Sequence, residues 1–159
     1  MPALSQVIKT NVDYAGKTYE SLFTPDIRAK SIPYETNTME TAVLWNNGKS
    51  FELKALPLEA QMSPVFGIIA DDLDGDGKTD IWLGGNFYSL KPQVGRNDGS
   101  RGVFLKGGSE RSFTYKPQQR DGLFVEGEVR DAAIIRSGQA KRLIVARNND
   151  KVLVFQKRK

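Results

Sequence analysis

Carboxylates recur at alternate positions in one short stretch of this chain, where they could hold a metal ion. Asp72, Asp74 and Asp76 are followed by Lys78 and Asp80, and glycines stand between them. So many negative charges in one loop repel one another unless a cation neutralises them. Oxygen ligands suit a hard cation, and a loose glycine-rich loop suits Ca²⁺ better than Mg²⁺. We therefore predict a calcium site with side-chain oxygens from the four aspartates and the backbone carbonyl of Lys78.

The flanking sequence predicts that this loop joins two strands and is not an EF-hand. An EF-hand needs a bidentate glutamate at its twelfth position, which here is Leu83, and a helix on either side. The residues on both sides, 68–70 and 81–83, are β-prone. Gly75 and Gly77 allow the sharp backbone path of a hairpin loop.

Two alternatives to a structural calcium site stay open. The first is a polar Asp/Gly turn that holds no ion, and the second is an ion that takes part in function. Four carboxylates and a carbonyl leave little room for a substrate, whereas catalytic metals keep an open position. Asp71 is expected to point away from the loop because side chains alternate along an extended strand.

Composition excludes several classes of chemistry. The 159 residues contain no histidine and no cysteine, which removes the commonest general base, thiolate catalysis and disulfides. We predict no enzyme activity and no catalytic residues. The net charge is +4, and basic residues are scattered except at 157–159, so no nucleic-acid partner is predicted. No stretch is long enough to span a membrane, and a weak calcium site points to an extracellular or cell-surface location.

The residues that must position the loop divide into two regions. Residues 1–40 read as a helical segment, with apolar residues near helical spacing from Leu4 to Val12 and a helix start at Thr24-Pro25. Residues 41–159 read as β-structure. The predicted strands are, in order, 42–45, 51–57, 64–70, 81–86, 103–105, 112–115, 129–135, 142–146 and 152–155, with one turn placed at 106–108.

A weak internal repeat runs through the second region. Residues 43–51 align with 104–113, each as a strand, a glycine turn and a phenylalanine that opens the next strand. Residues 66–86 align with 129–148, each as two strands around a turn. In the second copy, residues 136–140 stand where the first has the acidic loop.

Residues 67–84 resemble an FG-GAP/VCBS repeat, the calcium-bearing blade unit of integrin-α-like β-propellers, and all four aspartates of its loop match. More widely, residues 40–157 resemble the C-terminal part of large secreted bacterial proteins with VCBS repeats and an ASPIC/UnbV-type module. The resemblance rests on recurring phrases at 56–61, 84–88, 127–131 and 146–150. It implies a mainly β fold of partial, propeller-like antiparallel blades.

A propeller needs about 4–8 blades, and this chain holds two or three. We therefore expect it to be the terminal portion of a longer protein. Its strand edges would be covered by the N-terminal helices, the rest of a parent chain, a partner or a second copy.

The leading functional hypothesis is a calcium-stabilised scaffold or binding module with an unknown protein or glycan partner. Its candidate recognition surface is the loop at 87–101, which carries Tyr88, Lys91, Arg96 and Arg101, because aromatic and arginine side chains are enriched in interfaces.

The alternative hypothesis is a carbohydrate-binding or carbohydrate-active domain. Trp45 and Trp82 could stack on sugar rings, and Glu126 and Glu128 form an acidic pair near aromatic residues. Both tryptophans stand in apolar runs, however, which favours burial in a core.

Overall fold

The computed structural model describes residues 8–117, 122–138 and 140–157. Leu4 and Val7 of the predicted helical pattern and two of the three terminal basic residues lie outside these ranges. The chain divides into two compact units, Met1–Met39 and Glu40–Lys159, and each is described by itself. Within the described ranges, no helix has the length and apolar character needed to cross a membrane.

The described residues of the first unit form three short helices, α2 (Asn11–Tyr14), α3 (Tyr19–Leu22) and α4 (Pro25–Ala29). Thr10 caps α2 by accepting a hydrogen bond from the backbone N–H of Asp13. The predicted helix start at Thr24-Pro25 is confirmed, although the Thr24 side chain makes no capping hydrogen bond. None of the residues in these three helices is buried, so the described helices contribute no residue to an apolar core.

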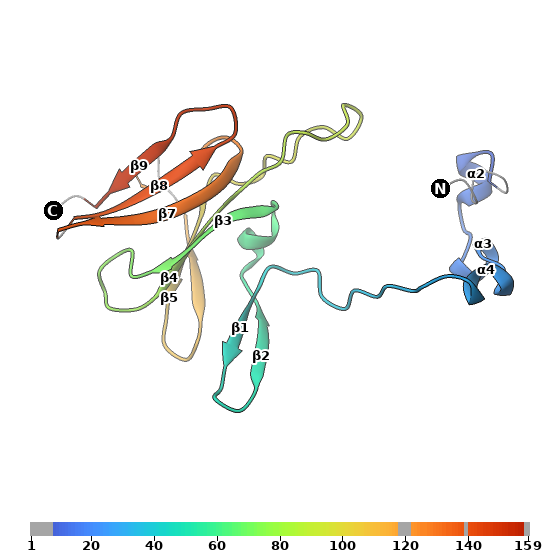
Figure 1. Ribbon diagram of the computed structural model, residues 1–159, viewed down its shortest axis with the longest axis horizontal. Helices are drawn as coiled ribbons and strands as arrows, with labels where there is room; N and C mark the ends of the chain where they lie inside the picture. The colour runs from blue at the N-terminus through green and yellow to red at the C-terminus, as the bar shows by residue number, and fades with distance from the viewer. Residues whose placement is uncertain (1–7, 118–121, 139, 158–159) are drawn as a thin grey trace. The chain divides into compact units, whose positions relative to one another are not determined.

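The second unit is antiparallel β-structure, as predicted, and its described residues form three sheets (Figure 1). A two-stranded sheet pairs β1 with β2, a four-stranded sheet has the order β3-β4-β5-β6, and a three-stranded sheet has the order β7-β8-β9. These described residues close neither a barrel nor a propeller. The strands are β1 (Ala42–Asn46), β2 (Phe51–Ala55), β3 (Val65–Asp71), β4 (Asp80–Gly85), β5 (Val103–Gly107), β6 (Phe113–Lys116), β7 (Val129–Ser137), β8 (Ala140–Arg147) and β9 (Leu153–Gln156).

The β3–β4 and β7–β8 hairpins have the same pairing pattern. Ala70 pairs with Ile81 in the first hairpin, and Ile134 pairs with Leu143 in the second. Each hairpin has an irregularity near the start of its first strand, between Val65 and Gly67 in one and between Val129 and Asp131 in the other. The two hairpins therefore correspond residue by residue from the irregularity to the pairs Asp71–Asp80 and Ile135–Arg142, and the second hairpin continues for two more pairs, to Ser137–Ala140.

The β3–β6 sheet carries an apolar core on each face. One face holds Leu83 and Leu105, against which Val43 of β1 packs. The opposite face holds Trp82, which packs with Leu143 and Val145 of β8. All six residues of β4 are buried, as expected for a strand with a packed layer on both sides.

The predicted turn at residues 106–108 is wrong at its first two residues, because Lys106 and Gly107 belong to β5. Gly107 pairs with Phe113, and its N–H donates to the buried carboxylate of Asp80, so the strand includes the first glycine. This extension places the Lys106 side chain beside the acidic loop.

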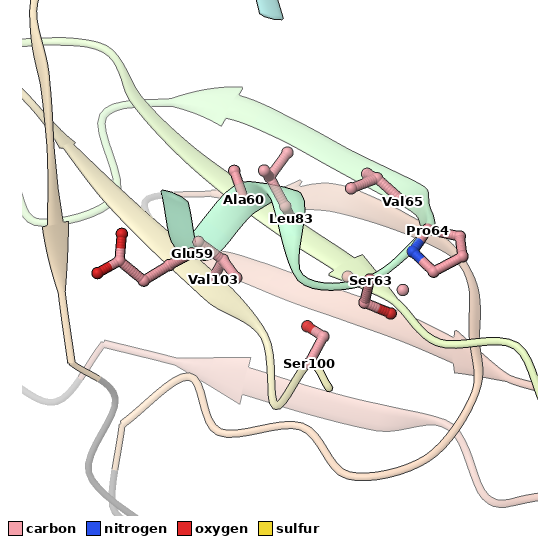
Figure 2. Close-up of a pocket in the computed structure, with 10 residues that line it drawn as sticks. Glu59, Ala60, Ser63, Pro64, Val65, Leu83, Ser100 and Val103 are labelled. Atoms are coloured by element: carbon pink, nitrogen blue, oxygen red, sulfur yellow. The ribbon is translucent and has the colours of Figure 1, made fainter. Parts of the chain in front are cut away.

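A small cavity lies beside the 3-10 helix η1 (Leu58–Gln61), as Figure 2 shows. Ala60, Ser63, Leu83 and Val103 are among its lining residues. Its volume of about 10 Å³ is at the lower limit for one water molecule. It is therefore a gap in the packing and not a ligand site.

Candidate metal site

The acidic loop connects β3 to β4 at the tip of their hairpin (Figure 1). Three of its carboxylates converge, because oxygen atoms of Asp72, Asp74 and Asp80 all lie within 4.8 Å of one another. Carboxylate oxygens brought this close form an arrangement that could hold a hard cation.

Asp80 anchors this group. Its side chain has no exposed surface, and its carboxylate accepts three backbone hydrogen bonds. Oδ1 accepts from the N–H of Gly107 at 2.8 Å. Oδ2 accepts from the N–H groups of Leu73 at 3.0 Å and Asp74 at 3.3 Å. Asp80 therefore ties the start of the loop to the end of β5.

Asp72 shapes the rest of the loop. Its two carboxylate oxygens accept from the N–H of Gly75 at 2.6 Å and of Gly77 at 3.0 Å. Both glycines have φ near +82°, a conformation that side chains with a Cβ rarely adopt. The two glycines thus give the loop the sharp backbone path that the sequence predicted, and this path brings their N–H groups to the Asp72 carboxylate.

Lysine side chains lie against the loop. Lys106 of β5 makes ion pairs with Asp74 and, at 2.9 Å, with Asp76, and these two contacts raise the pKa of its ammonium group. The hydrogen bond from Lys106 likewise lowers the pKa of Asp76. Lys157 donates to the backbone carbonyl of Asp74. The negative charge of the loop is therefore partly compensated by lysines from β5 and from the residue that follows β9.

Asp76 and Lys78, the other predicted ligands, lie in the same loop but outside the group of three carboxylates. Asp76 faces Lys106 and accepts from the N–H of Lys78 at 2.9 Å. Lys78 is exposed. The structure thus gathers three of the four predicted aspartates and turns the fourth toward a lysine.

Asp71 points away from this group, toward the β7–β8 hairpin. Its carboxylate pairs with Arg136 and, at 2.9 Å, with Lys141, and the hydrogen bond from Lys141 is the main reason that its pKa is lowered. Lys141 also donates to the carbonyl of Asp72 at 2.8 Å. Sequence reasoning missed this brace, although basic residues replace the acidic loop in the second hairpin.

The opposite end of the β3–β4 hairpin is held by a second polar cluster, centred on Asn86. This residue is buried with φ at +81°. Its side chain accepts from the N–H of Ser100 at 2.9 Å and donates to the carbonyls of Ser100 and Gly127 at 2.8 Å. The buried carboxylate of Glu128 accepts from the N–H of Tyr88 at 2.9 Å. These contacts fix both ends of the loop at residues 87–101.

Aromatic and arginine side chains meet on the predicted recognition loop and beside it. The guanidinium of Arg96 lies 5.1 Å from the ring centre of Tyr88. Arg130 lies over Phe66 and Phe87, at 5.2 and 5.6 Å from their ring centres. This composition is typical of interface hot spots.

The two tryptophans of the carbohydrate hypothesis lie in different surroundings. Trp82 is fully buried, so a sugar cannot stack on it in this fold. Trp45 is partly exposed, stacks on Phe113 at 5.7 Å with Arg111 over its ring, and lines a cleft of about 410 Å³. Of the acidic pair, Glu128 is buried in the polar cluster and Glu126 lies on the surface beside Arg101.

No family model, curated protein or solved structure matches this chain.

Proposed function

We propose that this chain is a calcium-binding segment of FG-GAP/VCBS-type β-repeats that serves as a scaffold or binding module of a secreted or surface protein. The observation that carries the proposal is the convergence of Asp72, Asp74 and Asp80 within 4.8 Å on a loop between two antiparallel strands. The ion's role is structural: it holds the hairpin tip in one shape.

The donor set and the charge distribution favour Ca²⁺ as the ion. The ligand atoms available are oxygens, and the loop around them is exposed from Gly75 to Thr79, which gives the adjustable shell that Ca²⁺ accepts more readily than Mg²⁺. On binding, the ion takes over the neutralising role of the Lys106 ammonium at Asp74.

The common pairing pattern of the β3–β4 and β7–β8 hairpins supports the repeat interpretation. Under this interpretation β3–β6 is one propeller-like blade, β7–β9 is most of the next, and β1–β2 is the outer pair of the blade before it. The loop at residues 87–101 is the proposed recognition surface, because Asn86 and Glu128 hold it on a rigid base.

The test is thermal unfolding of the full chain in excess calcium, magnesium or EGTA, with elemental analysis of each sample. At a calcium concentration about 100 times Kd, binding stabilises the folded chain by about 2.7 kcal/mol. We expect Tm to rise in calcium, to rise less in magnesium, and to be insensitive to calcium in Asp74→Asn. Asp98→Asn is the matched control, since it removes the same charge from an exposed residue outside the acidic loop.

Two results would contradict the metal site. One is an equal Tm in calcium and EGTA for a sample that elemental analysis shows to be free of metal. The other is an equal loss of the calcium effect in Asp74→Asn and Asp98→Asn, because the response would then reflect general charge screening.

A further inference from the structure

The three sheets of the second unit leave two apolar faces exposed, one at either end of the stack. On the β1–β2 hairpin, Leu44 pairs with Leu53, and these side chains are 58% and 53% exposed. On the β7–β9 sheet, Ala133 pairs with Ile144, which pairs with Val154, and Val154 is 58% exposed. Exposed apolar side chains that share one sheet face mark a surface that another layer covers.

The strand register shows which buried sheet faces are equivalent to these two exposed faces. Gly107 pairs with Phe113 as Asn46 pairs with Phe51, so β1 corresponds to β5. Leu105 pairs with Ile81 as Phe155 pairs with Leu143, so β5 corresponds to β9.

One series of equivalent residues faces the following sheet. Val43, Phe104 and Val154 occupy the same position on β1, β5 and β9. Val43 packs against the core that contains Leu105, and Phe104 packs against the core that contains Leu143. Only Val154, on the last of the three strands, is exposed.

The neighbouring series faces the preceding sheet. Leu44, Leu105 and Phe155 are equivalent on β1, β5 and β9. Leu105 is fully buried in the core that Val43 joins, and Phe155 packs into the core that Phe104 joins. Here the first member, Leu44, is the exposed one. The two end faces are thus the unmatched halves of an interface that the chain already forms twice.

We propose that the β7–β9 face carrying Val154 docks onto the β1–β2 face carrying Leu44 and Leu53 of a second copy of this chain. The contact is head-to-tail, because it joins two different surfaces, and repeated contacts of this kind generate a ring or an open filament. We assign a second copy to this contact because each exposed end face is equivalent to a face that is already buried within the chain. The face of Val154 is equivalent to that of Phe104, and the face of Leu44 is equivalent to that of Phe155, and these two buried faces pack in one core. The inference rests on the proposed repeat architecture but not on its calcium ion.

The test is sedimentation velocity of the full chain over a concentration series, in calcium and separately in EGTA. Leu53→Lys blocks one end face and Val154→Lys blocks the other. Both residues are more than half exposed, so the variants are expected to fold, which circular dichroism checks. Val12→Lys is the control, because Val12 is 82% exposed and lies in α2, outside the three sheets.

We expect the wild type and the control to associate as concentration rises, and each blocked variant alone to stay monomeric. An equimolar mixture of the two blocked variants should form a dimer and nothing larger, since each retains the face that the other has lost. This pattern in either buffer supports the inference, whereas the calcium dependence of Tm tests the metal site separately.

Three outcomes would overturn it. A wild type that remains monomeric up to about 1 mM, where a contact is worth about 4 kcal/mol, has no such interface. Association that survives in either blocked variant uses another surface. If the wild type is a monomer and Leu53→Lys lowers its Tm, a segment of the same chain covers the β1–β2 hairpin.

Discussion

Replacing Asp80 by asparagine should destabilise the fold even when no metal is present. The carboxylate is fully buried and accepts three backbone hydrogen bonds, one at Oδ1 and two at Oδ2. Asparagine keeps one acceptor oxygen but puts an NH₂ donor in place of the other. A rotamer that keeps the bonds to Leu73 and Asp74 therefore leaves the buried N–H of Gly107 facing a donor.

The magnitude follows from the balance of two effects. Losing one hydrogen bond to a charged group costs about 1.5–3 kcal/mol. Removing the Asp80 charge also relieves repulsion with Asp72 and Asp74, whose oxygens lie within 4.8 Å, and unit charges at such distances interact by roughly 1 kcal/mol in water. The two pairs together offset about 2 kcal/mol, so we expect a net loss of up to about 1 kcal/mol.

The assay is urea unfolding in EGTA, followed by tryptophan emission, because the fully buried Trp82 becomes exposed on unfolding. EGTA removes any contribution of calcium from the comparison. Asp76→Asn is the matched control, since it deletes the same charge from the same loop. Asp76 accepts one backbone hydrogen bond and makes a partly exposed ion pair with Lys106, and such pairs contribute about 0–1 kcal/mol.

The reasoning is refuted if Asp80→Asn unfolds at the same urea concentration as the wild type, or later, in EGTA. That result would mean that repulsion among the carboxylates outweighs the three hydrogen bonds. Equal losses in Asp80→Asn and Asp76→Asn would show that loop charge, and not burial, sets the effect.

Two further changes test the packing and the polar cluster. Gly84→Ala would place a Cβ 2.6 Å from the Trp82 ring and 2.8 Å from Val129, so overpacking should lower the free energy of unfolding by about 2 kcal/mol; a urea midpoint equal to that of the wild type would contradict this contact. Hydrogen bonds from the N–H of Tyr88 and then from Asn148, with the charge of Arg130, hold the pKa of Glu128 below its usual 4.5. The Glu128 carboxylate therefore stabilises the fold fully above pH 4.5, and this stabilisation is lost as the pH falls through the lowered pKa. Glu128→Gln should reduce stability near neutral pH and flatten the acid limb of the stability–pH curve, and parallel curves for the two proteins would disprove this.

The local β-structure around the candidate site could be predicted from sequence. Turn chemistry and strand propensity depend on neighbouring residues, so the glycine turn within residues 43–51 predicted the β1–β2 hairpin and the β-prone flanks predicted that the acidic loop joins two strands. The two glycines with positive φ follow from the same local reasoning.

The sequence was less informative wherever a position depends on pairing between strands. The predicted turn at 106–108 failed because Gly107 is drawn into β5 by Phe113 and by the buried Asp80. Two glycines in a row read locally as a turn, and the partners that override this reading lie elsewhere in the chain.

By itself, then, the sequence determined the acidic loop, its glycines and the strands beside it, and it excluded histidine and cysteine chemistry. Only the tertiary structure decided that Asp72, Asp74 and Asp80 converge while Asp76 turns to Lys106, and that Lys141 braces the loop from a hairpin about 70 residues away in sequence. The physical reason is that a turn forms from contacts within a few residues. The charges that meet at its tip are set by the register and stacking of whole sheets, which depend on all the apolar residues of the core at once.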